Sequence, residues 1–332
     1  MTLQNIIQKN KEQISLTIDE SVLLFSNIME GNLSDDEIKS ILINFSKKGE
    51  TVEEITGGVK VLRDKCLQVN IQGDIIDTCG TGGDGRNTIN ISTAVAITLG
   101  SMGLKVAKHG NKSVSSKSGS ANVLEKLGVD INKNPDQVVK SLEENNFAFM
   151  FAPNYHSAMK HVAKVRGELK QRTIFNLLGP LLNPAKVNRQ CIGVYSIDIL
   201  EKYIKVLKNI GLKKAWVFHS LDGLDEISIF EITKVYQLNN NEISKFEIDP
   251  KKFIKTSYTI EDIIGGDPDY NAEILKKTFR GEESACTEII ALNCAAGLVV
   301  LDKCSLIEEA YYKSKKHLLS GKVSDYLNKI KK

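Results

Sequence analysis

The first seventy residues carry hydrophobic positions at helical spacing. Apolar side chains recur every three or four residues in three stretches, and each stretch follows a Ser or Thr with a Glu three positions later. Such a pair is a capping box, in which two side chains satisfy backbone N–H groups at a helix start. The pairs are Thr17 and Glu20, Ser34 and Glu37, and Thr51 and Glu54. Gly31 and Gly49 stand where the first two helices should end, so the pattern predicts a small helical module.

From Asp74 onward, short apolar runs alternate with stretches at helical spacing. The runs predict strands over residues 75–78, 105–108, 147–151, 191–195 and 215–219. Residues 227–249 alternate around an asparagine-rich turn and predict an antiparallel hairpin, and the rest is expected to be helical. Short apolar strands that alternate with helices are typical of a mostly parallel sheet covered by helices. The predicted fold class is therefore α/β, with a small all-helical domain and a larger α/β domain.

Candidate chemistry gathers between residues 77 and 128. A glycine-rich loop follows the first strand, and a serine-rich loop follows the second strand one crossover later. The glycines are Gly80, Gly82, Gly83 and Gly85, and the nearby lysines are Lys105, Lys108, Lys112 and Lys117. A glycine-rich loop can be only a tight turn. Glycine also lets backbone N–H groups approach anionic oxygens, and a helix N-terminus adds further donors, so the combination predicts a ligand rich in phosphate.

Two common nucleotide-binding motifs are excluded. Gly80, Gly82 and Gly85 fit G-x-G-x-x-G, yet the polar residues that follow keep the stretch a loop where a helix should open. The acid expected about twenty residues later is also missing, since that neighbourhood holds Lys105 and Lys108. A P-loop is excluded because the sequence contains no G-x-x-x-x-G-K-[ST].

Seven motifs in order resemble the anthranilate phosphoribosyltransferase family. They are GTGGD at 80–84, NIST at 90–93, KHGN at 108–111, SVSSKSGSA at 113–121, VAKVRGELKQRTIFNLLGPLLNP at 162–184, DGLDEIS at 222–228 and GGDPDYNAEIL at 265–275. Together they cover nearly the whole chain. The main departure from the family lies at Asn293–Gly297, which is less alanine-rich than the resemblance predicts and concerns helix packing.

The resemblance implies transfer of phosphoribose from 5-phosphoribosyl 1-pyrophosphate to the amino group of anthranilate in tryptophan biosynthesis. It implies Mg²⁺, with two ions per subunit, and catalysis by positioning and metal without a catalytic nucleophile or base. It also implies a homodimer formed through the helical domain. In the family, residues 156–184 would return to the helical domain of residues 1–72, and residues 73–155 and 185–332 would form the α/β domain.

The resemblance also assigns the residues that bind the donor. They are Gly80, Gly82, Gly83, Asp84, Thr88, Asn90, Ile91, Ser92, Thr93, Lys108, His109, Gly110, Asn111, Lys112, Ser113, Val114, Ser115, Ser116 and Ser120. A lone histidine beside glycine, such as His109, is expected to pack or orient rather than to exchange protons. The thiol of Cys79, inside the same motif, is expected to be non-catalytic.

The resemblance assigns the acceptor and the metal to separate residues. Gly80, Asn111 and Arg166 would bind anthranilate, and a guanidinium such as that of Arg166 can grip a carboxylate with two hydrogen bonds. Ser92, Asp225 and Glu226 would hold Mg²⁺, and Asp84 could hold a magnesium-bound water or a loop amide. Without the resemblance, Asp225 and Glu226 would be interpreted as a solvated pair on an exposed loop, and Arg166 as a solvated helix arginine.

Composition narrows the alternatives. The net charge of +3 in 332 residues is too small to indicate nucleic acid as a partner. The six cysteines form no C-x-x-C pair, and the N-terminus is too polar for a signal peptide, so we expect a soluble, cytoplasmic protein without membrane contact. Two alternative functions remain: a pyrimidine nucleoside phosphorylase-like enzyme, and a non-catalytic nucleic-acid-binding paralogue with the same fold. The complete GTGGD motif and the Asp225–Glu226 pair disfavour both.

Overall fold

The computed structural model describes residues 2–112 and 117–331, and it begins with a helical bundle. The bundle consists of α1 (Leu3–Lys11), α2 (Ile18–Glu30), α3 (Asp35–Lys48) and α4 (Val52–Lys65). The capping boxes expected at Thr17, Ser34 and Thr51 are present, and Gly31 ends α2 with a φ of 76°. The sequence pattern did not predict α1, because this helix buries only Ile6 and Asn10 and so has a weak apolar stripe.

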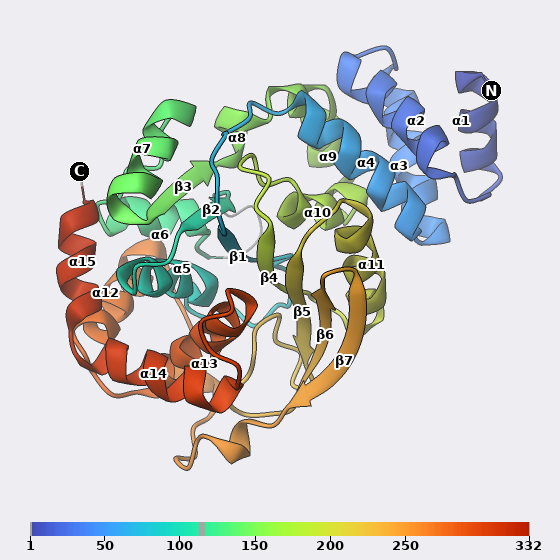
Figure 1. Cartoon of the computed structure of the whole chain (residues 1–332). Helices are drawn as coiled ribbons and strands as arrows, with labels where there is room; N and C mark the ends of the chain where they lie inside the picture. The colour runs from blue at the N-terminus through green and yellow to red at the C-terminus, as the bar shows by residue number, and fades with distance from the viewer. Residues whose placement is uncertain (1, 113–116, 332) are drawn as a thin grey trace.

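A seven-stranded sheet forms the centre of the larger part of the molecule (Figure 1). Its strands are β1 (Ile76–Gly80), β2 (Val106–Gly110), β3 (Phe147–Phe151), β4 (Arg189–Gly193), β5 (Lys214–Ser220), β6 (Thr233–Asn239) and β7 (Glu242–Ile248). The spatial order is β3-β2-β1-β4-β5-β6-β7, and β6 and β7 form the predicted antiparallel hairpin. The other neighbours are parallel. The predicted α/β class with a mostly parallel sheet is confirmed.

The strand order places a switch point at β1. After β1 the chain moves to β2 and β3 on one side, and it then returns to β4 and β5 on the other side. Ligands of such open sheets bind outside the carboxyl ends of the strands at the point where the order reverses. Gly80, Gly110 and Gly193 are the last residues of β1, β2 and β4, so all three lie at this edge.

Helices cover both faces of the sheet. The helices after β1 are α5 (Ile91–Ser101), α6 (Ser120–Lys126), α7 (Pro135–Asn145), α8 (Ala152–Tyr155), α9 (Lys160–Leu169), α10 (Ile174–Leu178), α11 (Leu200–Asn209), α12 (Pro268–Phe279), α13 (Ala285–Val300), α14 (Ile307–Leu319) and α15 (Lys322–Ile330). Cys191 and Trp216 face the core formed with α5 and α13, whereas Ile192 and Val217 face the core shared with α11 and the helical bundle. Successive strand residues thus supply two separate cores.

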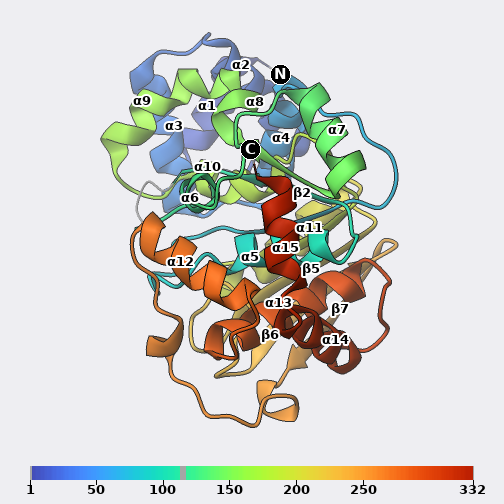
Figure 2. The ribbon, with the colours of Figure 1, turned by 90° about the vertical axis from the view of Figure 1, so that its left-hand side faces the viewer.

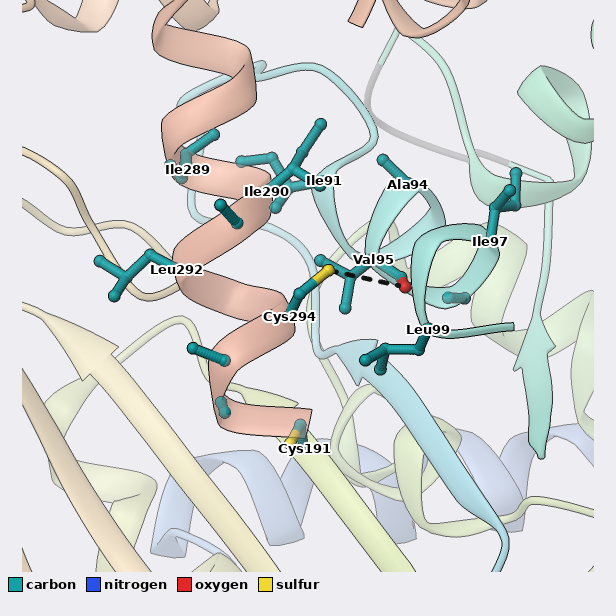
Figure 3. Packing of buried hydrophobic residues seen from close by; sticks show 14 of the residues in the cluster. Ile91, Ala94, Val95, Ile97, Leu99, Cys191, Ile289, Ile290, Leu292 and Cys294 are labelled. Carbon is teal, nitrogen blue, oxygen red and sulfur yellow. Dashed lines mark hydrogen bonds between the residues drawn. The ribbon is translucent and has the colours of Figure 1, made fainter. Parts of the chain in front are cut away.

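Helices α5 and α13 pack closely against each other on one face of the sheet (Figure 3). Gly297 of α13 lies against Leu99 of α5, because a Cβ at Gly297 would meet a Leu99 methyl group at 2.5 Å. Cys294 directs its thiol toward the Val95 carbonyl, at 3.9 Å. Every residue of α13 is buried. No helix in the part of the chain that the structure describes is long and apolar enough to cross a membrane.

The chain returns to the helical bundle after β3. Helices α9 and α10 pack against α2, α3 and α4, and Figure 2 shows α9 beside the bundle at the top of the molecule. Val165 and Phe175 share a buried cluster with Phe25, and the rings of Phe25 and Phe175 meet edge to face at 5.9 Å. Burial of these side chains joins the two segments, although the division of the chain into two domains stays a prediction.

Candidate active site

The glycine loop leaves β1 at the switch point of the sheet. Gly82, Gly83 and Gly85 have φ values of 64°, 80° and 76°, a region that favours glycine over other residues. Gly82 and Gly83 are exposed, so their backbone groups face solvent at the loop tip. The amide of Gly82 donates to the Asp225 carboxylate at 3.0 Å, and Arg172 donates to the Gly83 carbonyl. The loop is therefore held on one side by the carboxylate pair and on the other by the segment after α9.

Helix α5 begins beside this loop. Asn90 is its N-cap residue, but the Asn90 side chain does not cap the helix, and the Ser92 amide in the first turn meets the Glu226 carboxylate and lowers its pKa against the effect of burial. The Asn90 side chain instead donates to the Ser118 carbonyl at 3.1 Å and accepts from Asn271 at 2.9 Å. Uncapped amides at a helix start favour an anion. The α5 N-terminus and the glycine loop thus bring backbone amides to one edge of the sheet, where those of Gly82 and Ser92 meet Asp225 and Glu226.

Lys108 places a buried positive charge beneath the loop. This side chain is 2% exposed, and its ammonium donates to the Thr78 carbonyl and to Ser92 Oγ, the latter at 3.3 Å. Burial raises the pKa values of Asp77 and Glu226. The charge of Lys108 opposes this effect, because it lowers both pKa values and so favours the charged carboxylates. The geometry makes Lys108 the positive counterpart of the carboxylates beneath the loop.

The carboxylates of Asp84, Asp225 and Glu226 gather above Lys108. Burial, together with the nearby Asp84, raises the pKa of Asp225 to about 7, and burial and Asp225 raise the pKa of Glu226 well above its usual value. Asp84 Oδ1 accepts from the Arg86 amide at 3.1 Å, while its buried Oδ2 has no partner among the described residues. Excess negative charge of this kind favours the binding of a cation.

The expectation that the Asp225–Glu226 pair would be solvated on an exposed loop, as its sequence context alone suggested, is wrong. Both residues are half-buried, because the loop packs onto β4 where Gly193 has no side chain. A Cβ at Gly193 would overlap the Asp225 carbonyl, and a Cβ at Gly80 would lie 2.8 Å from Asp225 Oδ2. Two glycines at strand ends thus allow the carboxylate pair to approach the sheet.

No group of three His, Cys, Asp or Glu residues within residues 2–112 and 117–331 is arranged to hold a metal ion by itself. Mg²⁺ commonly takes one or two carboxylates and completes its shell with water and substrate phosphates. The surplus carboxylates and the unpaired Asp84 oxygen fit an ion that is shared with a phosphate ligand. Ser92, the third expected ligand, contacts Lys108 here.

Arg166 lies on α9, on the side of the helical bundle. Its guanidinium carbon is 5.4 Å from the centre of the Phe175 ring, and burial lowers the pKa of the side chain. Among the described residues, no hydrogen bond or ion pair engages the Arg166 guanidinium. A half-buried cation without an anion is costly. This arrangement suits an anionic ligand such as a carboxylate.

Two buried histidines lie next to each other behind the ends of β2 and β3. The Nε2 atoms of His109 and His156 are 3.2 Å apart, and burial lowers their pKa values to about 3 and about 4. The amide of His109 donates to Asp77 at 3.3 Å, and Asn183 donates to the other Asp77 oxygen at 2.8 Å. The imidazoles are neutral at physiological pH, a state that agrees with the orienting role expected for His109.

The remaining expected residues surround these groups. Thr88 forms an isolated antiparallel bridge with Ile264, and the side chain of Ile91 belongs to the core. Lys112 lies 3.1 Å from Glu125, and the hydroxyl of Ser120 donates to the carbonyl of exposed Asn111.

Thr93 and Gly110 belong to the sequence motifs of the site, and Cys79 directly precedes the GTGGD motif. The hydroxyl of Thr93 is buried, and Gly110 lies directly against Ser120. Burial raises the pKa of the Cys79 thiol well above its usual value, which disfavours the nucleophilic thiolate. The residues Ser113, Val114, Ser115 and Ser116 lie outside the described part of the chain.

Three residues near the site were missed from the sequence. Arg172 stacks on the Tyr195 ring at 3.7 Å and contacts Gly83, while Asn271 holds Asn90. Asn293 exchanges two hydrogen bonds of 2.9 Å with the backbone of Ile227, next to Glu226. For Asn293 a signal existed, because a polar side chain inside an apolar helix must find a partner.

Comparison with known proteins covers the same elements. Residues 4–66 match the family described as "Glycosyl transferase family, helical bundle domain", and residues 72–324 match "Glycosyl transferase family, a/b domain". The chain is 48% identical over 324 residues to the anthranilate phosphoribosyltransferase of Pelagibacter ubique, covering 98% of each chain. It resembles the crystal structure of the Thermus thermophilus anthranilate phosphoribosyltransferase with a TM-score of 0.92 and 31% identity, over 98% of both chains. The Saccharomyces cerevisiae enzyme in complex with PRPP and Mg gives a TM-score of 0.85 and 28% identity, over 94% of this chain and 91% of that one.

Proposed function

The chain belongs to the anthranilate phosphoribosyltransferase family of glycosyl transferases, and from this premise we propose that it transfers phosphoribose from 5-phosphoribosyl 1-pyrophosphate to anthranilate. The products are N-(5-phosphoribosyl)anthranilate and pyrophosphate, and the reaction is a step of tryptophan biosynthesis. The hydrogen bond between the Gly82 amide and Asp225 carries the proposal, because it joins a phosphate-binding loop to a carboxylate pair at the switch point.

We propose that the donor lies across the carboxyl ends of β1 and β2. Gly82 and Gly83 lie exposed at the loop tip, where donor phosphates would compete with Asp225 for the Gly82 amide, and the N-terminus of α5 adds further amides. The phosphates of the donor would meet these groups together with the serine-rich loop. Exposed Lys112 and Lys117 supply positive charge at the rim of this region.

Mg²⁺ fits the carboxylates on the opposite side of the loop. Asp225 and Glu226 would hold the ion, with Ser92 as a further ligand, and two ions per subunit are proposed. When bound, the ion neutralises negative charge on the departing pyrophosphate. The chain itself keeps these carboxylates in place through the Gly82 amide and limits their repulsion through Lys108.

The reaction requires positioning more than proton transfer. The C1–oxygen bond to pyrophosphate breaks, a bond from C1 to the anthranilate nitrogen forms, and the nitrogen loses a proton to solvent. An arylamine attacks without prior deprotonation, so the chain needs no nucleophile or general base. Buried, neutral His109 and His156 agree with this mechanism, because a pKa of about 3 or 4 makes each a weak base. Correct placement of the two substrates accelerates the reaction relative to the same reaction in solution.

We propose that Arg166 binds the anthranilate carboxylate, with Gly80 and Asn111 completing the acceptor site. The half-buried guanidinium, 5.4 Å from the centre of the Phe175 ring, supports this assignment. The acceptor would then approach from the helical bundle while the donor rests on the sheet. Both substrates would meet where the chain crosses between residues 156–184 and the α/β part.

A homodimer formed through the helical bundle and a cytoplasmic location are also proposed. The helical bundle exposes Ile14 and Leu23, by 47% and 38%, which such a dimer contact could bury. All six cysteines are free, as is usual in a reducing compartment. We expect no nucleic-acid partner, because the net charge is only +3.

One assay tests the proposed function. The loss of anthranilate fluorescence should require both 5-phosphoribosyl 1-pyrophosphate and Mg²⁺. Phosphorolysis of a pyrimidine nucleoside in place of this reaction would support the phosphorylase alternative. A protein without turnover that binds a random oligonucleotide tightly and in a salt-sensitive way would support the nucleic-acid-binding paralogue.

A further inference from the structure

The segment around Gly265 runs along the exit of the glycine loop. The Ile89 amide donates to the Ile263 carbonyl at 3.0 Å, and the Gly265 amide donates to the Asn87 carbonyl at 2.8 Å. Between these bonds, Thr88 and Ile264 form an antiparallel bridge. The chain just before α12 therefore holds the residues that lead from the glycine loop into α5.

Asn271 extends this contact with its side chain. It lies in the first turn of α12, is 1% exposed, and accepts from the Gly266 amide at 2.7 Å. The Asn271 side-chain atom that faces the Gly266 N–H group must be the acceptor Oδ1. The Nδ2 group of Asn271 is then free to donate. Nδ2 donates to Asn90 Oδ1 at 2.9 Å. A Cβ at Gly265 would lie 2.8 Å from Asn271 Oδ1, so this glycine is needed for the approach.

The orientation of Asn271 fixes that of Asn90. Since Asn90 Oδ1 accepts from Asn271, its Nδ2 group faces the other way and donates to the Ser118 carbonyl at 3.1 Å. Ser118 Oγ also donates to Asn90 Oδ1 at 3.2 Å. One pair of amides thereby connects α12, the start of α5 and the end of the serine-rich loop. A half-buried network of hydrogen bonds of this kind favours one arrangement of the three segments.

We propose that Asn271 is a positioning residue for the phosphoribosyl pyrophosphate site. It acts through Asn90, keeping the α5 amides and Ser118 at a fixed separation before the donor binds. The inference rests on the proposed function and extends it to α12, which packs against α6 just after that loop (Figure 2). A salt bridge of 2.8 Å between Lys126 and Asp269 joins the same two helices.

Two variants of Asn271 test the proposal. Asn271→Ala removes both hydrogen bonds, whereas Asn271→Asp keeps the acceptor for the Gly266 amide and loses only the donor to Asn90. Each should raise the KM for 5-phosphoribosyl 1-pyrophosphate about tenfold, the size expected for one lost buried hydrogen bond. The KM for anthranilate should stay within about twofold, because Asn271 reaches only the donor side. If the alanine variant fails to fold, the aspartate variant carries the test.

A control and a double-mutant cycle separate positioning from stability. Thr278→Val changes a buried residue later in α12 whose hydroxyl donates only within the helix, so melting temperature should fall without a change in either KM. Asn90→Ala and Asn271→Ala should be non-additive in the KM for the donor, because the second change finds the contact already lost. Additive effects, equal effects on both substrates, or a similar KM change in Thr278→Val would overturn the inference. An inactive wild-type protein would instead contradict the proposed function.

Discussion

The backbone amide of Gly82 donates a hydrogen bond of 3.0 Å to the carboxylate of Asp225, which lies 143 residues further along the chain. The bond ties the tip of the glycine loop to the carboxylate pair at the ends of neighbouring strands β1 and β4. An anion at the loop and a cation at Asp225 would therefore lie side by side. Asp225 can take this position because Gly80 and Gly193 lie directly against it. A Cβ at either glycine would collide with Asp225.

Gly83→Val should abolish binding of the donor while leaving the fold intact. Gly83 has a φ of 80°, and a Cβ there would collide with the Arg172 guanidinium. The loop tip would have to move, and its backbone would no longer meet the donor phosphates. Calorimetric titration with 5-phosphoribosyl 1-pyrophosphate should show no measurable heat.

Gly103→Ala is the matched control for this change. Gly103 also has a positive φ, 82°, but an added Cβ would meet nothing within 4 Å. Donor affinity should therefore be unchanged although the backbone is similarly strained. Unaltered affinity in a folded Gly83→Val protein would show that the loop tip does not contact the donor.

Arg166→Ala should raise the KM for anthranilate far more than the KM for the donor. Loss of one partner from a buried charged pair costs roughly 2–5 kcal/mol, which corresponds to at least a thirtyfold change. Lys164→Ala is the control, since Lys164 is exposed on the same helix and pairs with Asp35. Equal changes in both KM values would assign Arg166 a structural role.

Asn293→Ala should lower stability and slow turnover together. The change leaves the Ile227 N–H and C=O groups without partners in a buried place, at a cost of roughly 2–4 kcal/mol. Ile227 follows Glu226, so the carboxylate pair should also lose its position. Chemical denaturation and initial rates measure the two effects.

Leu298→Ala, in the same helix, separates these two effects. This side chain is 1% exposed and belongs to the core, so its truncation should cost a comparable free energy of unfolding. Turnover at a temperature where the protein is folded should nevertheless stay near that of the wild type. A similar loss of turnover in Leu298→Ala would mean that helix packing, and not the Ile227 contact, sets the rate.

His156→Asn should flatten the loss of stability in acid. Burial lowers the pKa of His156 to about 4, below that of an unfolded histidine, so the unfolded chain binds more protons between these values. Its contribution is complete above the unfolded pKa and is lost as the pH falls toward about 4. Between about pH 7 and pH 5 the wild type should lose on the order of 1–2 kcal/mol that the variant retains. An unchanged pH dependence of unfolding in His156→Asn would contradict this prediction.

Much of the fold could be predicted because its signals are local. Thr51 and Glu54 are three residues apart, and the apolar run of β3 is continuous, so spacing alone indicates a capped helix and a buried strand. Helix α1 was not predicted, because its few buried positions give only a weak periodicity of apolar residues. Gly82 and Gly83 were identified for the same local reason, since only glycine suits such a loop.

The contacts that complete the site are not local. Asn271 meets Asn90 across 181 residues, and Asn293 meets Ile227 across 66. No spacing in the sequence indicates such pairs, because they depend on which helix ends the fold brings to the same edge. The half-buried state of Asp225 likewise depends on Gly193, a strand end far from it in sequence.

Asp225→Asn combined with Glu226→Gln should abolish most turnover while the protein stays folded. Burial raises the pKa of both carboxyls, with a further contribution from Asp84 at Asp225 and from Asp225 at Glu226, so their neutral amides should not destabilise the ligand-free protein. The lost stabilisation of developing charge by the metal is worth several kcal/mol. Raising the Mg²⁺ concentration should recover part of the activity if the ion is only bound more weakly.

The double variant also distinguishes the enzyme from a nucleic-acid-binding relative. The double variant carries no more negative charge than the wild type, so oligonucleotide binding should stay unchanged or become stronger. Turnover and its Mg²⁺ dependence should therefore be measured for both forms beside binding to a random single-stranded oligonucleotide. Asp222→Asn serves as the matched control, because Asp222 lies in the same loop but accepts from Ser228 and the Leu224 amide. Wild-type turnover in the double variant would refute the assignment of Asp225 and Glu226 to the metal, because catalysis would then proceed without either carboxylate.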